Sequence, residues 1–342
     1  MIKVTDENLV IPQTAFIAMV IKAITNTKLH AKPFTIHING EECKVNFNQR
    51  SIGTEYKFTY QKTFQESKTR EKKEINIGIT FKNFFPNKKG VYPEITDKHL
   101  KMLLYFLEKK ETEFEFLATD FGRVCGLSKD KRNIGNSYKV LEDLLNIEIR
   151  IIDSENELAG EMEFVPLINV LNKRTKVAKV SLTKMLDLNG VIIKETLSRA
   201  KVEMINLIDY TETGQMVIPK KLFELKLDKN KTLGASSVAF NILYLESVSK
   251  QNRLNVIYNV STVLGWIGIA EEDYKNFFIK NKGKTHKYYI SRLEKIFQEL
   301  NICGIKAKLK GVKVKNKTEF YLKEQVIVDL TEFKNTLIKN DE

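Results

Sequence analysis

The pattern of hydrophobic and polar positions divides the chain into three segments. In residues 1–92, a helical spacing over residues 13–25 gives way to alternation of hydrophobic and polar side chains, which is typical of strands. Residues 34–38 alternate directly before Asn39-Gly40, a dipeptide favoured in hairpin turns, and the alternation resumes at Val45. The first segment is therefore predicted to hold one helix and a β-rich region that begins with a hairpin.

Two further alternating runs, at residues 56–60 and 75–81, lie on either side of a polar stretch. This stretch, residues 65–74, has no hydrophobic residue and carries four basic side chains. Two interpretations stay open for it, a solvated loop and an arm that contacts DNA.

Residues 93–186 change to helical spacing and then back to alternation. Thr96 and Asp97 are residue types that cap helix N-termini, and leucines recur at helical spacing after them. A short helix ending at Gly126 and a further helix are expected next. Alternating isoleucines over residues 147–151 then predict a strand of a hairpin. The predicted order is three helices followed by a hairpin.

Residues 187–342 repeat this order. The spacing predicts an extended run at residues 216–219 and helices at residues 188–208, 236–248, 260–269 and 287–300. Beyond the last helix, hydrophobic side chains alternate with lysines up to a turn at Gly311, and a second strand is expected to reach residue 322. We therefore expect an α+β chain with a duplicated module, divided into residues 1–92, 93–186 and 187–342.

Charge concentrates at the C-terminal repeat of this module. Residues 282–323 hold eleven Lys and one Arg against three Glu, which accounts for +9 of the chain's net charge of +13. Phosphate backbones are bound mainly by Lys and Arg that displace counterions, so this surface favours a nucleic-acid partner. An anionic membrane surface would also attract a basic chain, and charge alone does not separate the two.

Several other classes of protein are disfavoured. The apolar stretch at residues 10–24 is too short and too polar to span a membrane, and no signal-peptide pattern precedes it, which predicts a cytoplasmic protein. The three cysteines are spaced too widely for a metal site or a disulfide framework, so buried thiols are expected. Gly283-Lys284-Thr285 lacks the first glycine of a phosphate loop, and the four histidines form no metal-binding pair. We expect no catalysis, no cofactor and no metal.

A helix, a turn, a second helix and a basic hairpin are the parts of a winged helix, in which the later helix enters the major groove and the hairpin lies along the backbone. Arg292 is suited to a bidentate contact with guanine and the lysines to phosphates. The alternative is a solvated helix face. The candidate DNA-contacting residues of the third segment are Lys282, Lys284, Thr285, His286, Lys287, Tyr288, Arg292, Lys306, Lys308, Lys310, Lys313 and Lys315.

The second segment offers a weaker candidate site. Its hairpin region, residues 153–163, carries five acidic side chains that phosphate would repel. This copy is expected either to contact DNA through its helix alone or to form a dimerisation surface. The candidates near the start of that helix are Lys129, Lys131, Arg132, Asn133, Asn136 and Lys139.

With this arrangement, residues 96–330 resemble the plasmid replication initiators, the Rep proteins with two tandem winged-helix domains. Residues 116–128 resemble the helix-turn-helix of their first domain, and residues 216–223 the extended lead into the second. The resemblance implies binding to repeated origin sequences in double-stranded DNA, a monomer–dimer switch through the first domain, and recruitment of host replication proteins. The β-rich residues before Thr96 are not part of that pattern.

Three hypotheses follow. The favoured one is a sequence-specific DNA-binding initiator of a plasmid or mobile element. The second is a winged-helix transcriptional regulator that binds a promoter operator. The third is a metal-dependent nucleic-acid enzyme whose carboxylates assemble only in the folded chain.

Overall fold

The structure is a computed structural model of the whole chain. It describes residues 7–12, 34–38, 41–52, 55–65, 72–81, 96–108, 113–125, 137, 140–141, 143–144, 147–153, 165–166, 168–170, 199–204, 215–226, 233–249, 253–269, 271–280, 285–311 and 317–338. Within these ranges the fold is mixed helix and sheet, which confirms the predicted α+β class. The helix predicted at residues 13–25 lies outside them.

A six-stranded antiparallel sheet contains most of the described part of the N-terminal segment. Its strands, in spatial order, are β2 (Phe34–Ile38), β3 (Glu41–Ile52), β4 (Glu55–Gln65), β5 (Lys72–Phe81), β7 (Ile147–Asp153) and β8 (Val165–Pro166). Ile38 pairs with Glu41, so β2 and β3 form the hairpin that the alternation predicted. The strands β4 and β5 extend to Gln65 and Lys72, which narrows the predicted loop at residues 65–74 from both ends.

A three-stranded sheet follows the helix α2 (Asp97–Glu108). Its strands, in spatial order, are β6 (Glu113–Leu117), β10 (Arg199–Met204) and β9 (Ile168–Val170). The short helix α3 (Ala118–Val124) comes directly after β6, and residues 137–144 are helical where the structure describes them.

The C-terminal segment contains a second three-stranded sheet. Its strands, in spatial order, are β12 (Asn255–Asn259), β14 (Gln325–Asp329) and β13 (Lys306–Leu309). The helices are α7 (Ala235–Val248), α8 (Val260–Trp266), α9 (Glu271–Lys280), α10 (Thr285–Leu300), α11 (Lys317–Lys323) and α12 (Thr331–Ile338). Short 3-10 helices, η2 (Lys220–Glu224) and η3 (Asn301–Cys303), precede α7 and follow α10.

The two three-stranded sheets have the same topology. In each, the strand after the first helix lies at one edge, the last strand in sequence is central, and all pairs are antiparallel. The helices between the first and second strands also correspond, apart from the additional helix α9. This common order supports the predicted duplication, because the order of elements was its basis.

Two predictions of secondary structure are corrected, and one strand has an additional partner. Residues 199–204, predicted as part of a helix, form the strand β10, because Ala200, Val202 and Met204 follow a two-residue period. Residues 320–322, predicted as a hairpin strand, belong to α11, and β13 pairs with β14 instead. The predicted hairpin strand at residues 147–151 is β7, which pairs with β8 as a hairpin would but also with β5 of the N-terminal sheet.

Strand pairing crosses both expected domain boundaries. β5 pairs with β7 across the boundary at residue 92, and β6 pairs with β10 across the boundary at residue 186. In addition, β1 (Asn8–Pro12) pairs with β11 (Gln215–Pro219), the extended run predicted at residues 216–219. The domain boundaries stay predictions, but the segments share sheets.

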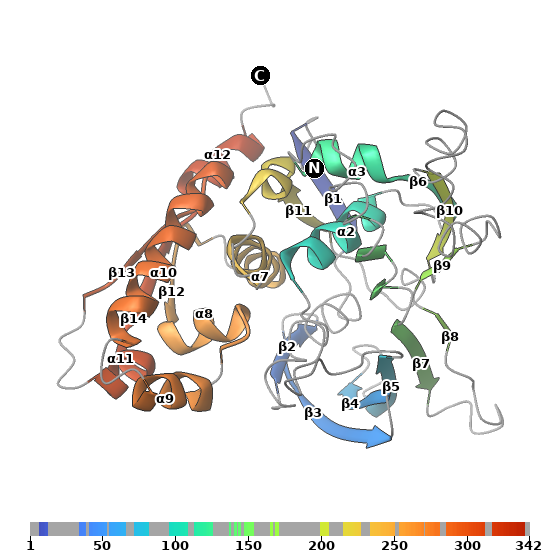
Figure 1. The fold of residues 1–342 in the computed structure, drawn as a ribbon, viewed down its shortest axis with the longest axis horizontal. Coiled ribbons are helices and arrows are strands. Elements are labelled where there is room, and N and C mark those ends of the chain that lie inside the picture. The colour runs from blue at the N-terminus through green and yellow to red at the C-terminus, as the bar shows by residue number, and fades with distance from the viewer. Residues whose placement is uncertain are drawn as a thin grey trace, which may run out of the picture.

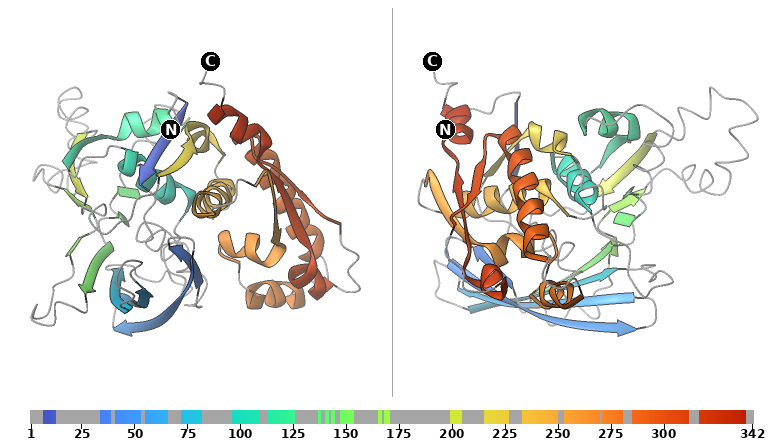
Figure 2. Two further views of the ribbon diagram at one scale, coloured as in Figure 1. Left: turned by 180° about the vertical axis from the view of Figure 1, so that it is seen from behind. Right: turned by 60° about the vertical axis from the view of Figure 1, so that its left-hand side comes forward.

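Helix α7 lies at the centre of the molecule. It contacts α2 and β11 on one side and α10 and α8 on the other, as Figure 1 shows. Residues 235–244 are buried all round the helix, which explains why this sequence is hydrophobic without a polar face. Figure 2 shows the C-terminal strands alongside α10, and β13 packs against this helix.

Candidate nucleic-acid interface

Helix α10 has one buried face and one exposed face. Leu293, Phe297 and Leu300 are buried against the core. The exposed positions recur every three or four residues along the opposite face, as expected for a helix packed on one side. They are Lys287, Tyr288, Ser291, Glu294, Lys295 and Gln298. Apart from the carboxylate of Glu294, this face offers cationic, hydroxyl and amide groups, which are donors that contact phosphates and base edges.

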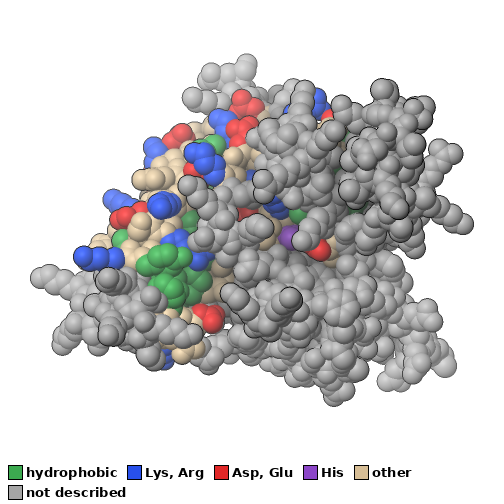
Figure 3. All heavy atoms as spheres, in the orientation of Figure 1, with side chains coloured by type: hydrophobic (Ala, Val, Ile, Leu, Met, Phe, Trp, Pro, Cys, Tyr) green, Lys and Arg blue, Asp and Glu red, His purple; other side chains and the backbone are tan. Residues whose placement is uncertain are grey.

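The strand β13 adds a row of lysines beside this helix. Lys306 and Lys308 are exposed, while Ala307 and Leu309 between them are half-buried, and Lys310 follows the strand in an exposed position. β13 packs against α10. Figure 3 shows basic side chains, with a hydrophobic patch beside them, on the described surface of the C-terminal part.

The three lysines differ in their partners. The Lys306 ammonium lies 3.0 Å from a carboxylate oxygen of Glu332, and Lys310 donates a hydrogen bond of 2.9 Å to the side chain of Gln325. Lys308 lies opposite Ile327 in the register of the sheet. Because Gln325 is neutral, an anionic neighbour offsets the charge of Lys306 but not that of Lys310, and Lys308, opposite an isoleucine, is a further candidate to contact a phosphate.

Gly304 makes the tight connection between α10 and β13 possible. Its φ is 71°, in the left-handed region that glycine adopts without strain. A Cβ at this position would come within 3.0 Å of the Phe333 backbone nitrogen, which donates a hydrogen bond to the Gly304 carbonyl. The angle between helix and lysine strand thus depends on this glycine.

Arg292 lies on the side of α10 that turns toward the core. It is half-buried, and its Nη2 donates a hydrogen bond of 3.2 Å to the carbonyl of Leu233, just before α7. This bond gives the side chain a positioning contact. Base readout by Arg292 stays a prediction.

Asp97 caps α7 from a different part of the chain. Its two carboxylate oxygens accept hydrogen bonds from the backbone nitrogens of Gly234 at 2.9 Å and Ser236 at 3.1 Å. Gly234, the N-cap residue, has no side chain for this role. Asp97 is fully buried, and burial raises its pKa. A helix cap was predicted at Asp97, but the helix that it caps is not its own.

Lys101 lies one turn further along α2 and joins α2 to η2. Its Nζ donates to the carbonyls of Phe223 at 2.7 Å and Leu225 at 2.6 Å. The side chain is 1% exposed, and burial lowers its pKa despite the attraction of nearby anionic groups. Asp97 therefore attaches α2 to the beginning of α7, which in turn contacts α10, and Lys101 attaches α2 to η2.

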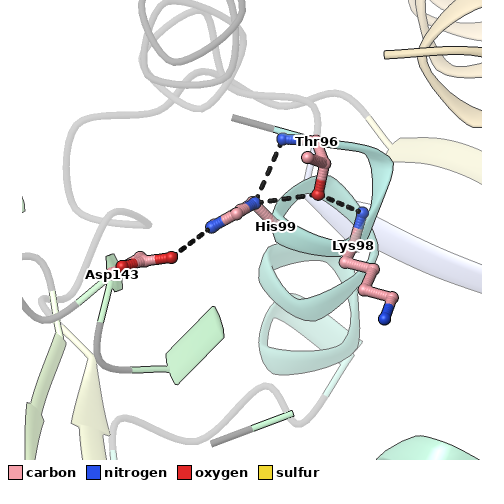
Figure 4. A network of polar contacts seen from close by, with 4 residues as sticks. All are labelled: Thr96, Lys98, His99 and Asp143. Atoms are coloured by element: carbon pink, nitrogen blue, oxygen red, sulfur yellow. Dashed lines mark hydrogen bonds and ion pairs between the residues drawn. The ribbon is translucent and has the colours of Figure 1, made fainter. Parts of the chain in front are cut away.

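A third network links α2 to the helical residues at 137–144 (Figure 4). The Thr96 backbone nitrogen donates to Nδ1 of His99 at 3.1 Å, which leaves Nε2 to donate to Asp143 at 3.1 Å. The Thr96 hydroxyl accepts from the Lys98 nitrogen at 3.3 Å. The Thr96 hydroxyl, the His99 imidazole and the Asp143 carboxylate follow the order of a catalytic triad. The bonds of Thr96 with Lys98 and His99 form a reciprocal cap at the N-terminus of α2, in which His99 occupies the position where Glu is usual.

The structure describes part of the predicted set of contact residues. Thr285 and His286 begin α10, and Lys287 and Tyr288 are exposed on its first turn. The remaining predicted contacts lie outside the described residues: Lys282, Lys284, Lys313, Lys315, Lys129, Lys131, Arg132, Asn133, Asn136 and Lys139.

Three side chains on the outer face of α10 were missed from the sequence. They are Ser291, Lys295 and Gln298, which follow Lys287 at intervals of four, four and three residues. This spacing was visible in the sequence once Leu293 and Phe297 were assigned to the core.

Other expectations concern the thiols, metals and membranes. Cys125 and Cys303 are buried free thiols, as predicted, and burial raises their pKa values to about 11 and about 12. In the part of the chain that the structure describes, no three His, Cys, Asp or Glu side chains gather as metal ligands would. Among the same residues, no helix is long and apolar enough to cross a membrane.

No protein-family model matches the chain, and no curated protein matches it. Among solved structures, it is similar to the crystal structure of RctB domains 2-3, with a TM-score of 0.38 and 9% sequence identity over 82% of this chain and 92% of that chain. So low a score carries no argument, and the function of this chain has to be inferred from its own contacts and charges.

Proposed function

We propose that this protein binds double-stranded DNA in a sequence-specific manner through a winged-helix arrangement in its C-terminal segment. The observation that carries the proposal is the polar outer face of α10 next to the exposed lysines of β13. In this proposal α10 enters the major groove and β13, with the chain beyond it, follows the neighbouring backbone. Lys308 contacts phosphate, and Ser291 and Gln298 face the base edges.

The repeated sheet topology supports a second winged helix, formed by α2, α3, the helical residues at 137–144 and the sheet β6-β10-β9. Two such modules on one chain suit a DNA target with repeated elements. We therefore assign the protein the role of a replication initiator of a plasmid or mobile element, acting without catalysis, cofactor or metal. Dimerisation through the first module, contact with host replication proteins and a cytoplasmic location are parts of the same proposal.

Selection of DNA fragments by the purified protein tests this role. A salt concentration of about 150 mM weakens non-specific electrostatic binding and exposes sequence preference. Recovery of a tandem-repeat array beside an AT-rich segment is the expected result. A single promoter site would replace the initiator with a transcriptional regulator, and no enrichment would overturn sequence-specific binding.

A further inference from the structure

Five aromatic rings form one continuous cluster where α9, α10 and α11 meet. Ring centroids lie 5.1 Å apart between Tyr321 and Tyr274, 5.0 Å between Tyr274 and Tyr289, and 5.1 Å between Phe277 and Tyr288. Tyr274, Tyr289 and Tyr321 are buried, but Tyr288 is 41% exposed. The cluster is a packed core with one ring at its outer end.

The Tyr288 ring is supported from two sides. It is tilted by 33° against Phe277, and its centroid lies 5.2 Å from that of Tyr289, at an interplanar angle of 76°. These contacts restrict the side chain before any ligand arrives. A planar ligand that stacks on this ring would therefore immobilise little additional side-chain freedom.

The surrounding chain is strongly basic. Between Asp273 and Glu294 the sequence holds six basic residues and no acidic one. One of them, Lys287, is exposed directly before Tyr288. An exposed ring set in cationic sequence is the combination with which proteins bind single-stranded nucleic acid.

We infer that Tyr288 is a stacking platform for an unpaired base of single-stranded DNA. Lys287, which is exposed next to Tyr288, holds a phosphate that neighbours this base. A hydrophobic protein partner is less suited, because the exposed neighbours of Tyr288 on α10, Lys287 and Ser291, are polar. The inference rests on the proposed function, because it takes DNA as the ligand. It adds single-stranded DNA as a second ligand beside double-stranded DNA.

Photo-crosslinking identifies the contact directly. The full-length protein is irradiated with a thymidine strand of about 16 nucleotides that carries iododeoxyuridine, a base analogue that crosslinks to stacked aromatic side chains. We expect the adduct on Tyr288. Adducts found only elsewhere would overturn the inference, and this arm needs no variant that has to fold.

Affinity for the same strand at about 150 mM salt gives a second measurement. Tyr288→Ala should weaken binding about ten-fold, whereas Tyr288→Phe keeps the ring and should stay within about two-fold of the wild type. Leu322→Ala is the matched control, because Leu322 is an exposed hydrophobic residue on α11 without an aromatic ring. Wild-type affinity of Tyr288→Ala, or an equal loss in Tyr288→Phe, would contradict stacking.

A duplex arm separates this inference from the proposed function. If the wild-type protein shows no sequence preference among duplexes, the result counts against the proposed function and not against stacking on Tyr288. The single-strand results for Tyr288 are unaffected by that outcome and decide the stacking platform by themselves.

Discussion

Lys308 is the lysine of β13 whose charge is most available to DNA. We expect Lys308→Ala to weaken binding to all sequences alike and to lower the slope of log affinity against log salt by about 1, because one phosphate contact is lost. Lys306→Ala should lower the slope by less, since Glu332 already neutralises part of its charge at 3.0 Å. Titrations at several salt concentrations measure both slopes.

Lys220 supplies the control for that series. It is exposed on η2 and is not one of the proposed contacts on α10 or β13, so its removal should leave the slope unchanged. If Lys220→Ala lowered the slope as much as Lys308→Ala, the protein would bind DNA through its overall charge and not through the lysines of β13.

Arg292 requires binding and stability to be measured together. Its hydrogen bond to Leu233 contributes on the order of 1 kcal/mol to stability, so Arg292→Ala should lower the free energy of unfolding by about that amount. If it also reads a base, affinity for the selected site should fall by about 1 to 3 kcal/mol while affinity for random DNA stays the same. Equal losses on both DNAs would assign Arg292 to positioning alone.

Tyrosines of the aromatic cluster set a limit to stability at high pH. Burial raises the pKa values of Tyr274, Tyr289 and Tyr321 to about 12, from an ordinary value of 10.0. Because the folded-state pKa exceeds the unfolded one, the contribution of these groups is fully present below pH 10.0 and is lost as the pH rises toward about 12. Thermal unfolding between these pH values should show a falling melting temperature.

The variant Tyr274→Phe checks the cause of this loss. Its melting temperature should fall less steeply over the same range, because phenylalanine cannot ionise. An unchanged pH dependence would exclude Tyr274 as a contributor.

At the scale of single elements, the N-terminus of α7 depends on a side chain from α2. Asp97→Ala should lower the free energy of unfolding by about 1 to 3 kcal/mol, since two backbone N–H groups of α7 lose their acceptor. Asp97→Asn should cost less than Asp97→Ala, because the amide oxygen keeps one of the two acceptors, while the amide nitrogen cannot accept from the second N–H. Denaturant unfolding of the three proteins gives the ranking.

Asp120→Ala is the matched control for this substitution. Asp120 lies in the first turn of α3 and forms an exposed ion pair of 3.2 Å with Arg123, so its loss should cost below about 1 kcal/mol. An Asp97→Ala variant no less stable than Asp120→Ala would contradict the cap observed at α7.

The exposed face of α10 shows what an element needs from its neighbours to become a site. The helix itself follows from spacing in the sequence, and so does the alternation of β13. Which partner each lysine has is decided by Glu332 of α12, which forms an ion pair with Lys306, and by Gln325 of β14, which accepts a hydrogen bond from Lys310. That information is tertiary, because ion pairs form between side chains that only folding brings together.

For the whole molecule, the C-terminal segment is not an independent unit. β11 pairs with β1, and Asp97 and Lys101 reach from α2 to α7 and η2. We therefore expect a fragment starting at residue 187 to show less helix by circular dichroism and a lower melting temperature than the full chain. Co-expression with residues 1–186 should restore both. A fragment as stable as the full chain would show that these contacts contribute little to its folding.

The sequence by itself determined many of the helices and strands and the location of charge. Helical spacing predicted α2, α7, α8 and α10, alternation predicted the strands of the N-terminal sheet, and the lysine count located the basic C-terminal surface. These features are local, because a helix or strand buries one face according to residues a few positions apart.

Tertiary structure decided the pairing of strands and the orientation of the candidate interface. β7 joins the N-terminal sheet, and β10 is a strand although the spacing of its residues had predicted a helix. Asp97 caps α7 although the two lie 137 residues apart in the sequence. Such choices depend on which surfaces meet when the chain closes on itself. Patterns within short windows do not contain that information, since each strand or polar side chain can satisfy its hydrogen bonds with many partners that are equivalent in sequence.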